Sequence, residues 1–460
     1  DRDNIAPHYI YSLIRGIEEM LRNKQTMTLE QAEKIIGLFE AIRASGVEIP
    51  FEKGDEKAWL ADWIEVHKVS VDALLFLTEN KQIKQQLHTA KRKEIGDIIS
   101  YFLTIKSSPS KEQEKPEYGE PYHVAINSVR GRAYEAFVVF AENEGNVLTD
   151  DVKTIFKQAL ADDSIAVRFV IGRYLASFYF RDKEFIKGLL PEIFPKDDPA
   201  KKDMYLASWE GYLSNTLYDQ LFTEFKEYYE HAIGLDPATY TDRKYTKSLD
   251  ELLATHLSLA YIHLDLKIGD PLFDLFWKTP NATRHHEFAS FIGRSCLTRD
   301  QAGDEWLKEH KVSKEKLIEF WNWMLTTELP IEPKAFAGFG FWVNPNKEVI
   351  DEKIVVKNLA ATLKKSDGEI DWDYGLTQRL KVLAEVDPAN TLEIIRNYLL
   401  KDGELNPHRR SPLFSLEHEI KEALVVIYKK PAMKNDVKEL IDTLIEKGSS
   451  AFWGLKDILD

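Results

Sequence analysis

A phrase that recurs along the chain constrains its fold more than any other feature of the sequence. Val129-Arg130 and Val167-Arg168 each open an amphipathic segment, 38 residues apart, and each follows a short polar stretch. A second phrase, Ile171-Gly172-Arg173, returns 121 residues later as Ile292-Gly293-Arg294, which is close to three further periods. A period near 40, in which a polar turn precedes each helix, is typical of HEAT-like repeats. The sequence therefore predicts an all-α chain, built as an α-solenoid of HEAT/TPR-like helical hairpins.

The composition supplies enough apolar material for such an array. A chain of 460 residues is too long for one ordinary core, so we expect two to four domains or one extended array. Apolar residues make up 44% of the chain, and the aromatic residues are numerous, with 10 Trp, 19 Tyr and 24 Phe. We expect most of these rings to fill uneven gaps between helices, and an aromatic binding surface is the alternative use for them.

Charge and cysteine content exclude several kinds of partner and site. A formal net charge of −15 repels a phosphate backbone, so nucleic acid is not expected as a partner. The single cysteine, Cys296, allows neither a disulfide within the chain nor a Cys-based zinc site, and we expect it to be buried rather than nucleophilic. Its isolation fits a reducing cytoplasm. No run of about 18 apolar residues occurs, so no membrane partner is expected.

Three regions can be distinguished along the chain. Residues 1–105 form an N-terminal helical segment, residues 106–121 form a linker or long loop with three Pro and one Gly, and residues 122–460 form the solenoid. A sub-boundary is expected near 236–248. Because the chain starts without Met and without a signal peptide, we expect it to be a piece of a longer polypeptide.

Local signals mark where individual helices begin. Thr28 to Gln31, Ser248 to Glu251 and Thr298 to Gln301 have the spacing of a capping box, in which a hydroxyl and a carboxyl or amide group satisfy each other's backbone N–H. Each is expected to start a helix. The stretch 330–346 is rich in Pro, Gly and aromatic residues and is expected to be a loop or a distorted helix. No segment alternates polar and apolar residues convincingly enough to predict a strand.

No set of residues forms a catalytic signature. Neither GxxxxGK[ST] nor GxGxxG occurs, and the nearest glycine-rich stretch, 338–340, has no strand before it. Asp371 and Asp373 could bind Mg²⁺ or act in acid–base chemistry, but a helix follows them and N-capping is the favoured interpretation. We therefore predict that this chain is not an enzyme and uses no metal or cofactor.

Histidines supply the most site-like short sequence. Arg284-His285-His286-Glu287 would need a second His at position 290 to form the HExxH zinc motif, and that position is Ser290, so a polar helix start is favoured. His256 and His263 lie seven residues apart on an apolar face and could both face a groove. The favoured interpretation is two partly buried histidines, because no carboxylate shares their register.

Arginines and the aromatic stretch supply the candidate partner contacts. A basic loop, 406–412, is the first choice for a polar ligand contact, because guanidinium groups recognise carboxylate and phosphate well. By contrast, Arg130, Arg132, Arg168 and Arg173 recur with the repeat and are expected to pair with turn carboxylates such as Asp162 or Asp163. The full set of predicted partner contacts is His408, Arg409, Arg410, His285, His286 and Trp342.

Several phrases, taken in order, resemble the C-terminal helical region of very large bacterial and archaeal NTPases of the STAND/NACHT type, found in antiviral defence. They span roughly residues 122–460 and are 125–133, 166–175, 209–213, 291–295, 339–342 and 452–459. The resemblance implies a sensor that contacts a foreign protein, such as a phage protein, and releases NTPase domains of the same polypeptide. The matching phrases are structural, so no catalytic residue carries over.

Two classes of function remain open at this point. The leading hypothesis is a non-catalytic recognition module whose aromatic and Arg side chains hold a protein partner. The alternative is a helical enzyme or small-ligand receptor with a site between repeats, around His256, His263 and His285. A scaffold or adaptor for endogenous partners is a third hypothesis.

Overall fold

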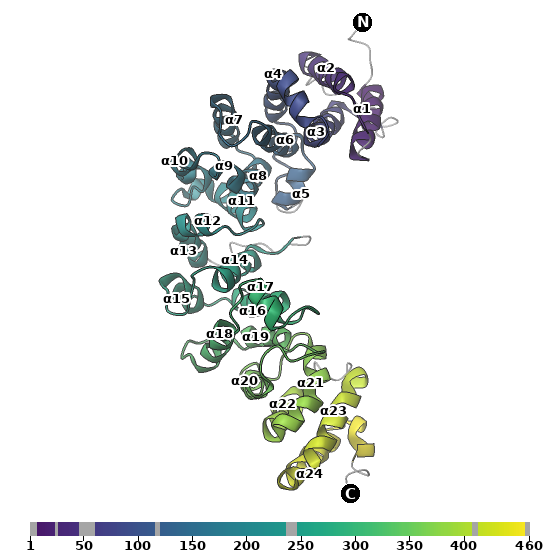
Figure 1. Ribbon diagram of the computed structural model, residues 1–460, viewed down its shortest axis with the longest axis vertical. Coiled ribbons are helices and arrows are strands. Elements are labelled where there is room, and N and C mark those ends of the chain that lie inside the picture. The colour runs from purple at the N-terminus through teal and green to yellow at the C-terminus, as the bar shows by residue number, and fades with distance from the viewer. Residues whose placement is uncertain are drawn as a thin grey trace. The chain divides into compact units, whose positions relative to one another are not determined.

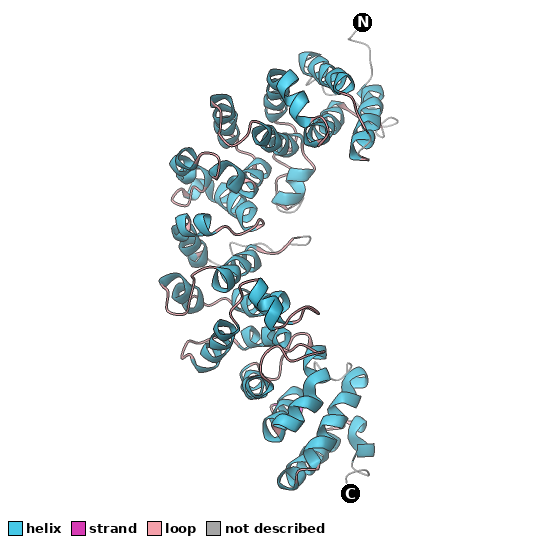
Figure 2. Cartoon of the chain, viewed as in Figure 1, coloured by secondary structure: helices cyan, strands magenta, loops and turns pink. Residues whose placement is uncertain are grey.

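The computed structural model describes residues 7–23, 26–45, 60–115, 120–235, 246–406 and 413–455. This part of the chain is almost entirely helical (Figure 2). Its strands are limited to one short antiparallel pair, β1 (Leu400–Lys401) and β2 (Glu404–Leu405), in which Leu400 lies opposite Leu405. The predicted all-α class is therefore confirmed.

The chain divides into two compact units. The first contains residues 1–218 and 241–246, and the second contains residues 219–240 and 247–460. The stretch 106–121 lies within the first unit. Its described part packs against helix starts: the Ser108 hydroxyl accepts from the Val129 amide at 3.0 Å, and Glu114 accepts from the Ala166 amide at 3.3 Å.

Helices of 5 to 20 residues make up most of the described part of the first unit. They are α1 (Pro7–Arg22), α2 (Leu29–Ser45), α3 (Trp63–Glu79), α4 (Lys84–Leu103), α5 (Pro121–Ile126), α6 (Val129–Asn143), α7 (Asp150–Leu160), α8 (Ile165–Arg173), α9 (Leu175–Tyr179), α10 (Lys183–Ile193), the 3₁₀ turn η3 (Pro199–Lys201) and α11 (Lys202–Leu213).

The second unit continues in the same manner. Its elements are α12 (Asp219–Glu224), α13 (Lys226–Gly234), α14 (Leu249–His263), α15 (Pro271–Lys278), α16 (Ala282–Ile292), the π-helical turn η5 (Gly293–Leu297), α17 (Asp304–Glu309), α18 (Lys314–Thr326), α19 (Pro333–Ala337), the 3₁₀ turn η6 (Gly338–Trp342), α20 (Glu352–Lys365), α21 (Asp373–Val386), α22 (Pro388–Leu399), α23 (Leu413–Tyr428), η8 (Pro431–Met433), α24 (Lys434–Glu446) and η9 (Ser450–Phe452). In the stretch 330–346, residues 333–342 form a short α-helix that continues as a 3₁₀ turn, and the residues on either side form loops, so each of the two predicted alternatives holds for part of the stretch.

Within each unit, helices that alternate along the chain pack against one another. In the first unit, α3 packs against α6, α6 against α8 and α8 against α11, and α4, α7 and α10 contact this row from one side (Figure 1). In the second unit, the corresponding first row is α14, α16, α19 with η6, α21 and α23. A second row there contains α13 with α15, and α18, α20 and α22. Each helix therefore buries one face against its neighbours in a row.

Polar residues before the helices do what the sequence predicts in most cases. Ser128 and Ser164 are the N-caps of α6 and α8, and Ser248 forms a complete capping box with Glu251 at the start of α14. The prediction for Thr298 is wrong. Its hydroxyl bonds back to the Arg294 carbonyl at the end of the π-turn, and the next helix starts only at Asp304.

Glycines allow the closest helix crossings. A Cβ atom built on Gly172 in α8 would lie 1.8 Å from the Ser208 carbonyl oxygen in α11, and one on Gly211 would lie 2.0 Å from the Phe169 carbonyl oxygen. Both distances are far below van der Waals contact, so only a residue without a side chain fits at this crossing.

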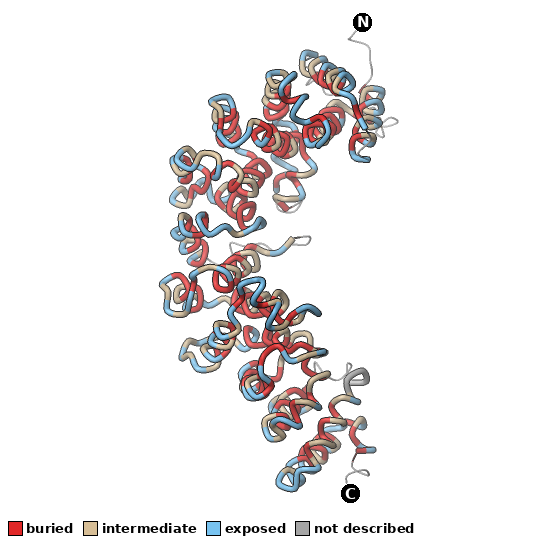
Figure 3. The backbone as a smooth tube through the Cα atoms, in the orientation of Figure 1, coloured by how far each residue is buried: buried red, intermediate tan, exposed pale blue. Residues whose placement is uncertain are grey.

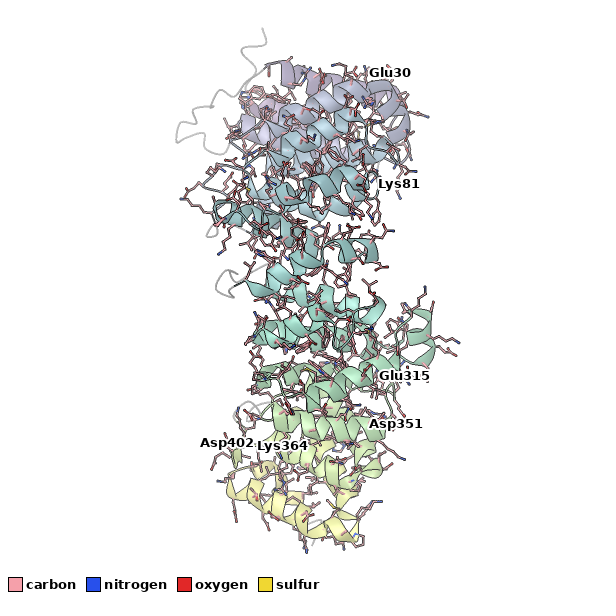
Figure 4. The ribbon with its side chains drawn as sticks, turned by 90° about the vertical axis from the view of Figure 1, so that its left-hand side faces the viewer. Glu30, Lys81, Glu315, Asp351, Lys364 and Asp402 are labelled. Atoms are coloured by element: carbon pink, nitrogen blue, oxygen red, sulfur yellow. The ribbon has the colours of Figure 1, made fainter. Side chains whose placement is uncertain are left out.

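Aromatic rings fill the space between the rows, as the composition suggests. In the second unit, Trp321 stacks on Phe339 with ring centres 5.2 Å apart, and Trp277 packs against Phe288 at 5.3 Å. Figure 3 shows the buried faces turned toward neighbouring helices within each unit. Charged side chains such as Glu30, Lys81 and Glu315 project outward (Figure 4), as expected of an acidic, solvated exterior.

Gly172→Ala should loosen the crossing of α8 and α11, because its methyl group would push against backbone that cannot move aside. We expect a loss of about 2–4 kcal/mol, seen as faster hydrogen exchange in peptides from both helices. Gly188→Ala is the matched control: this glycine is in α10, and no neighbouring atom lies within 4 Å of the place that an added methyl group would occupy, so the change should raise stability by about 0.5–1 kcal/mol. Equal exchange rates in the two variants would contradict the close-packing argument.

Candidate functional site

The two Ile-Gly-Arg phrases form the same local arrangement in both units. In each, the glycine packs against a neighbouring element, with Gly172 against Ser208 and Gly293 against Phe341. The arginine that follows is half-buried and lies over an aromatic ring: the Arg173 guanidinium is 5.2 Å from the centre of the Tyr122 ring, and that of Arg294 is 5.3 Å from the centre of Phe341. These distances are within the range of a cation–π interaction.

The first site consists of Tyr122, Arg173 and Tyr174. Arg173 ends α8 and also lies 6.0 Å from the centre of the Tyr174 ring. The Asn215 side-chain amide donates to the Arg173 carbonyl at 2.5 Å, which fixes the backbone there. Among the described residues, no carboxylate forms an ion pair with Arg173. Its guanidinium therefore presents N–H groups that a partner's carboxylate or carbonyl can accept.

Carboxylates border the first site without pairing with its arginine. Burial raises the pKa of Tyr174 and the charges of Glu135 and Glu79 act in the same direction, whereas the charge of Arg173 and its hydrogen bond with the Tyr174 hydroxyl act in the opposite direction. Partial desolvation also raises the pKa of Glu79; the charge of Arg132 opposes this shift, and the nearby carboxylates of Glu135 and Glu142 support it. The surface thus carries a cation beside a negative region, a pattern that favours a partner of mixed charge over a simple anion.

The second site consists of Arg294, Phe341 and Trp372. Here the arginine is occupied: it donates to both carboxylate oxygens of Glu287 at 2.8 Å, and Lys247 donates to the same carboxylate at 2.7 Å. Phe341 stacks on Trp372 with ring centres 5.7 Å apart and planes at 10°. This site therefore presents half-buried ring faces rather than an unpaired cation.

Trp372 holds an unusual backbone conformation. Its φ is +47° and ψ is 54°, in the left-handed region that a bulky side chain rarely adopts. It precedes α21 as the N-cap residue and makes no side-chain cap. The predicted capping by Asp371 or Asp373 is wrong, because Asp371 bonds to His286 and Asp373 accepts from the Tyr398 hydroxyl at 2.7 Å.

His286, Ser290 and Asp371 are the residue types of a nucleophilic triad but lack its geometry. The Asp371 carboxylate lies 2.5 Å from Nε2 of His286, and the Ser290 hydroxyl lies 3.4 Å from the same nitrogen. In a triad the carboxylate and the hydroxyl bond to different ring nitrogens. Ser290 is also fully buried. Burial alone would raise the pKa of Asp371, but the hydrogen bond and charge of His286 and the charge of Arg294 outweigh it and lower that pKa. The group ties α16 to the start of α21.

Buried arginines join helices rather than face a partner. Arg130 pairs with Asp162 at 2.6 Å, which confirms the predicted pairing with a turn carboxylate. Arg168 instead donates to the carbonyls of Leu160 and Glu192, at the ends of α7 and α10, and Arg284 donates to the carbonyl of Ile233 at the end of α13. Helix ends leave carbonyl groups unpaired and carry partial negative charge, so a buried guanidinium satisfies both.

Two predicted contact residues lie in the core. His285 is 1% exposed, hydrogen-bonds to the Phe276 carbonyl at 3.1 Å, and stacks on Trp277; burial lowers its pKa. Trp342 is equally buried, and its indole N–H donates to the Ala289 carbonyl at 2.9 Å. Because neither side chain reaches the surface, neither can contact a partner in this conformation.

The other predicted contacts are less buried or lie outside the described residues. His286 is half-buried and bonded to Asp371. His408, Arg409 and Arg410 lie outside the described residues.

The histidines of the alternative enzyme hypothesis have separate surroundings in the described structure. His256 is buried and bonded to the Tyr229 hydroxyl at 2.8 Å. His263 is more exposed, and partial desolvation of its ring, together with the charges of His310 and Lys316, lowers its pKa. Cys296 is buried as predicted, and burial raises its pKa to about 12, so the reactive thiolate is not formed near neutral pH. No group of three or more His, Cys, Asp or Glu side chains suited to a metal ion occurs in the described ranges.

The arginine–aromatic sites were only partly visible in the sequence. The recurrence of Ile-Gly-Arg was the available signal, but it does not show which ring lies beneath each arginine. Tyr122 precedes Arg173 by 51 residues, and Phe341 follows Arg294 by 47, so both pairings depend on the packing of separate helices.

Comparisons with known proteins add no relative: no protein-family model, no curated protein and no solved structure matches the chain. Among the described helices, none combines the length and the apolar character that crossing a bilayer requires.

Arg284→Met should destabilise the second unit strongly, because Asp250 would keep a buried charge without its main partner. We expect a loss of about 3–5 kcal/mol, measured by hydrogen exchange in α14 and α16. Adding Asp250→Asn should recover part of the loss. Lys34→Ala removes an exposed ion pair with Glu30 and should cost less than about 1 kcal/mol; equal effects of the two single changes would contradict the buried pairing.

Acid should destabilise the first unit through His67. Burial lowers the pKa of this ring to about 4, although Asp62 acts in the opposite direction, and Nε2 lies 3.2 Å from the Tyr101 hydroxyl. In the unfolded chain His67 binds a proton near pH 6.5, whereas in the folded chain it stays neutral down to about pH 4. The contribution of the neutral ring to the free energy of unfolding is therefore fully present above pH 6.5 and is lost as the pH falls toward 4. Between pH 7 and pH 5 we expect a loss of about 2 kcal/mol in the exchange stability of α3. In His67→Phe this part of the pH dependence should vanish; its persistence would assign the effect to other groups.

Proposed function

We propose that the chain is a non-catalytic recognition module that binds a protein partner. The observation that carries the proposal is Arg173, a half-buried guanidinium without an ion-pair partner among the described residues, lying over Tyr122 and beside Tyr174. Arginine and tyrosine are the residue types that contribute most binding energy at protein interfaces. A cation already fixed over a ring loses little conformational freedom when a partner binds.

The proposed architecture is an α-solenoid of HEAT-like hairpins within each unit. It is supported by the rows of alternating helices, by serine N-caps at the starts of α6 and α8, and by the recurrence of the Ile-Gly-Arg arrangement in both units. In such arrays each hairpin packs on its neighbours and extended surfaces remain available for partners.

We further propose that the module is the C-terminal sensor of a larger cytoplasmic STAND/NACHT-type defence NTPase. This part of the proposal depends on the resemblance of ordered sequence phrases. Its partner would be a foreign protein, such as a phage protein, and binding would release the NTPase domains of the same polypeptide.

Co-expression of the chain with individual phage proteins, followed by affinity purification, tests the proposal. We expect one phage protein to co-purify with the unmodified chain and to be lost with Arg173→Glu, with at least a tenfold weaker affinity. Lys353→Glu is the charge-matched control, because this lysine is exposed at the first turn of α20, and it should retain the partner.

Two results would contradict the proposal. If the Arg173→Glu variant kept the partner at unchanged affinity, the first site would not be part of the interface. Failure of every phage protein to bind, together with a small molecule that co-purifies with the chain and is turned over, would favour an enzyme.

A further inference from the structure

A groove at the end of the second unit lies away from the arginine–aromatic sites. It has a volume of about 520 Å³ and is formed by α21, α23 and the chain after η9. Its lining residues are Lys381, His418, Lys421, Glu422, Val425, Val426, Lys429, Gly454 and Leu455. All of these residues belong to the same unit.

The floor of the groove is one face of α23. His418, Glu422, Val425 and Lys429 are spaced at i, i+4, i+7 and i+11, which places them on the same side of a helix. The stripe therefore extends over about three turns, or roughly 16 Å at 1.5 Å per residue. Val425 and Val426 are half-buried at its centre, so apolar surface remains in contact with solvent.

Position in the row explains why this face is incompletely covered. Other first-row helices of this unit, such as α16 and α21, pack between two neighbours, whereas α23 is the last first-row helix among the described elements. Beyond this row, α23 is contacted by α22, α24 and the short turns η8 and η9, and the stretch with Val425 and Val426 is left half-buried.

The rim of the groove is positively charged on a chain whose net charge is −15. Three lysines and one glutamate line it, and Lys421 is paired with Glu417 beside the groove. Glu422 is occupied by Lys381 at 3.3 Å and by His418 at 3.6 Å. Lys429 is exposed and has no ion-pair partner among the described residues.

An exposed tryptophan adjoins the groove. Trp453 is 62% exposed and immediately precedes Gly454 and Leu455, which line the groove. Tryptophan is over-represented among residues that dominate interface energies, and a ring this exposed has surface to bury when a partner binds.

We propose that this groove binds an amphipathic α-helix of a partner protein, one whose apolar face is flanked by Asp or Glu. A groove along three turns of a helix, with valines at its centre and polar side chains at its ends, is the form of a helix-binding groove. Lys429 favours acidic flanks by charge complementarity. This inference does not depend on the proposed function, because none of its residues belongs to the arginine–aromatic sites.

The probe for the test is a fluorescein-labelled 15-residue peptide that forms an amphipathic helix, with Leu along one face and Glu beside it. A matched peptide carries Lys in place of each Glu. Fluorescence anisotropy with the full chain should show saturable binding of the acidic peptide and at least tenfold weaker binding of the basic one. Raising the salt concentration should weaken the acidic complex, because the rim charges are exposed.

Variants at exposed side chains assign the binding to the groove without threatening the fold. Lys429→Glu and Trp453→Ala should each lower the affinity for the acidic peptide at least tenfold. Lys353→Glu and Arg173→Glu should leave that affinity unchanged. If Arg173→Glu were the only variant to abolish binding of the acidic peptide, the peptide would be bound at the first site, and the assignment to the groove would be wrong.

Other outcomes would also overturn the inference. These are no binding of the acidic peptide, equal affinity for the two peptides, or an affinity unchanged by both groove variants. Binding to phosphatidylserine vesicles that needs Lys429 and Trp453, without binding of the peptide, would assign the groove to a membrane surface instead.

Discussion

A chain folded into many helices has many helix ends, each with unpaired carbonyl groups. Buried guanidinium groups donate hydrogen bonds to the carbonyl groups at ends that water does not reach. Arg168 bridges carbonyl groups in the last turns of α7 and α10, and Arg284 bridges the end of α13 and the Asp250 carboxylate at the start of α14. An unpaired carbonyl in the core would cost about 1–3 kcal/mol. A planar group with five N–H donors satisfies several such acceptors from one position, which a lysine could not do.

Close approach is the second requirement of the fold, and it explains why the recurring phrases contain glycine. Gly172 and Gly211 bring α8 and α11 together, and Gly293 does the same between the π-turn and η6. The phrase Ile-Gly-Arg thus combines a packing residue with an arginine that the packing places beside a ring. The two Ile-Gly-Arg phrases are therefore packing phrases, and they indicate architecture more directly than the identity of a partner.

Features that depend on residues close together in the sequence, such as N-caps, could be predicted. Contacts between segments far apart in the sequence could not. Ser128 and Ser248 cap helices within four residues of themselves, so their roles could be seen in advance. Thr298 has the same local pattern, but a π-turn held by tertiary packing ends at Leu297 and leaves no helix for it to start. Asp371 bonds to a histidine 85 positions away. Trp342 was expected at the surface and lies in the core, because nothing in its own segment shows which helix covers it.

Trp372 shows how a strained residue can still stabilise the place where it sits. Its left-handed backbone costs on the order of 1 kcal/mol or more, and the stacking of its ring on Phe341 contributes about 0.5–1.5 kcal/mol beyond the apolar area that the ring buries. The half-buried ring also lies against Gly375 in the first turn of α21. A glycine at position 372 would relax the backbone but would uncover both surfaces, so the indole acts as a clamp between η6 and the start of α21.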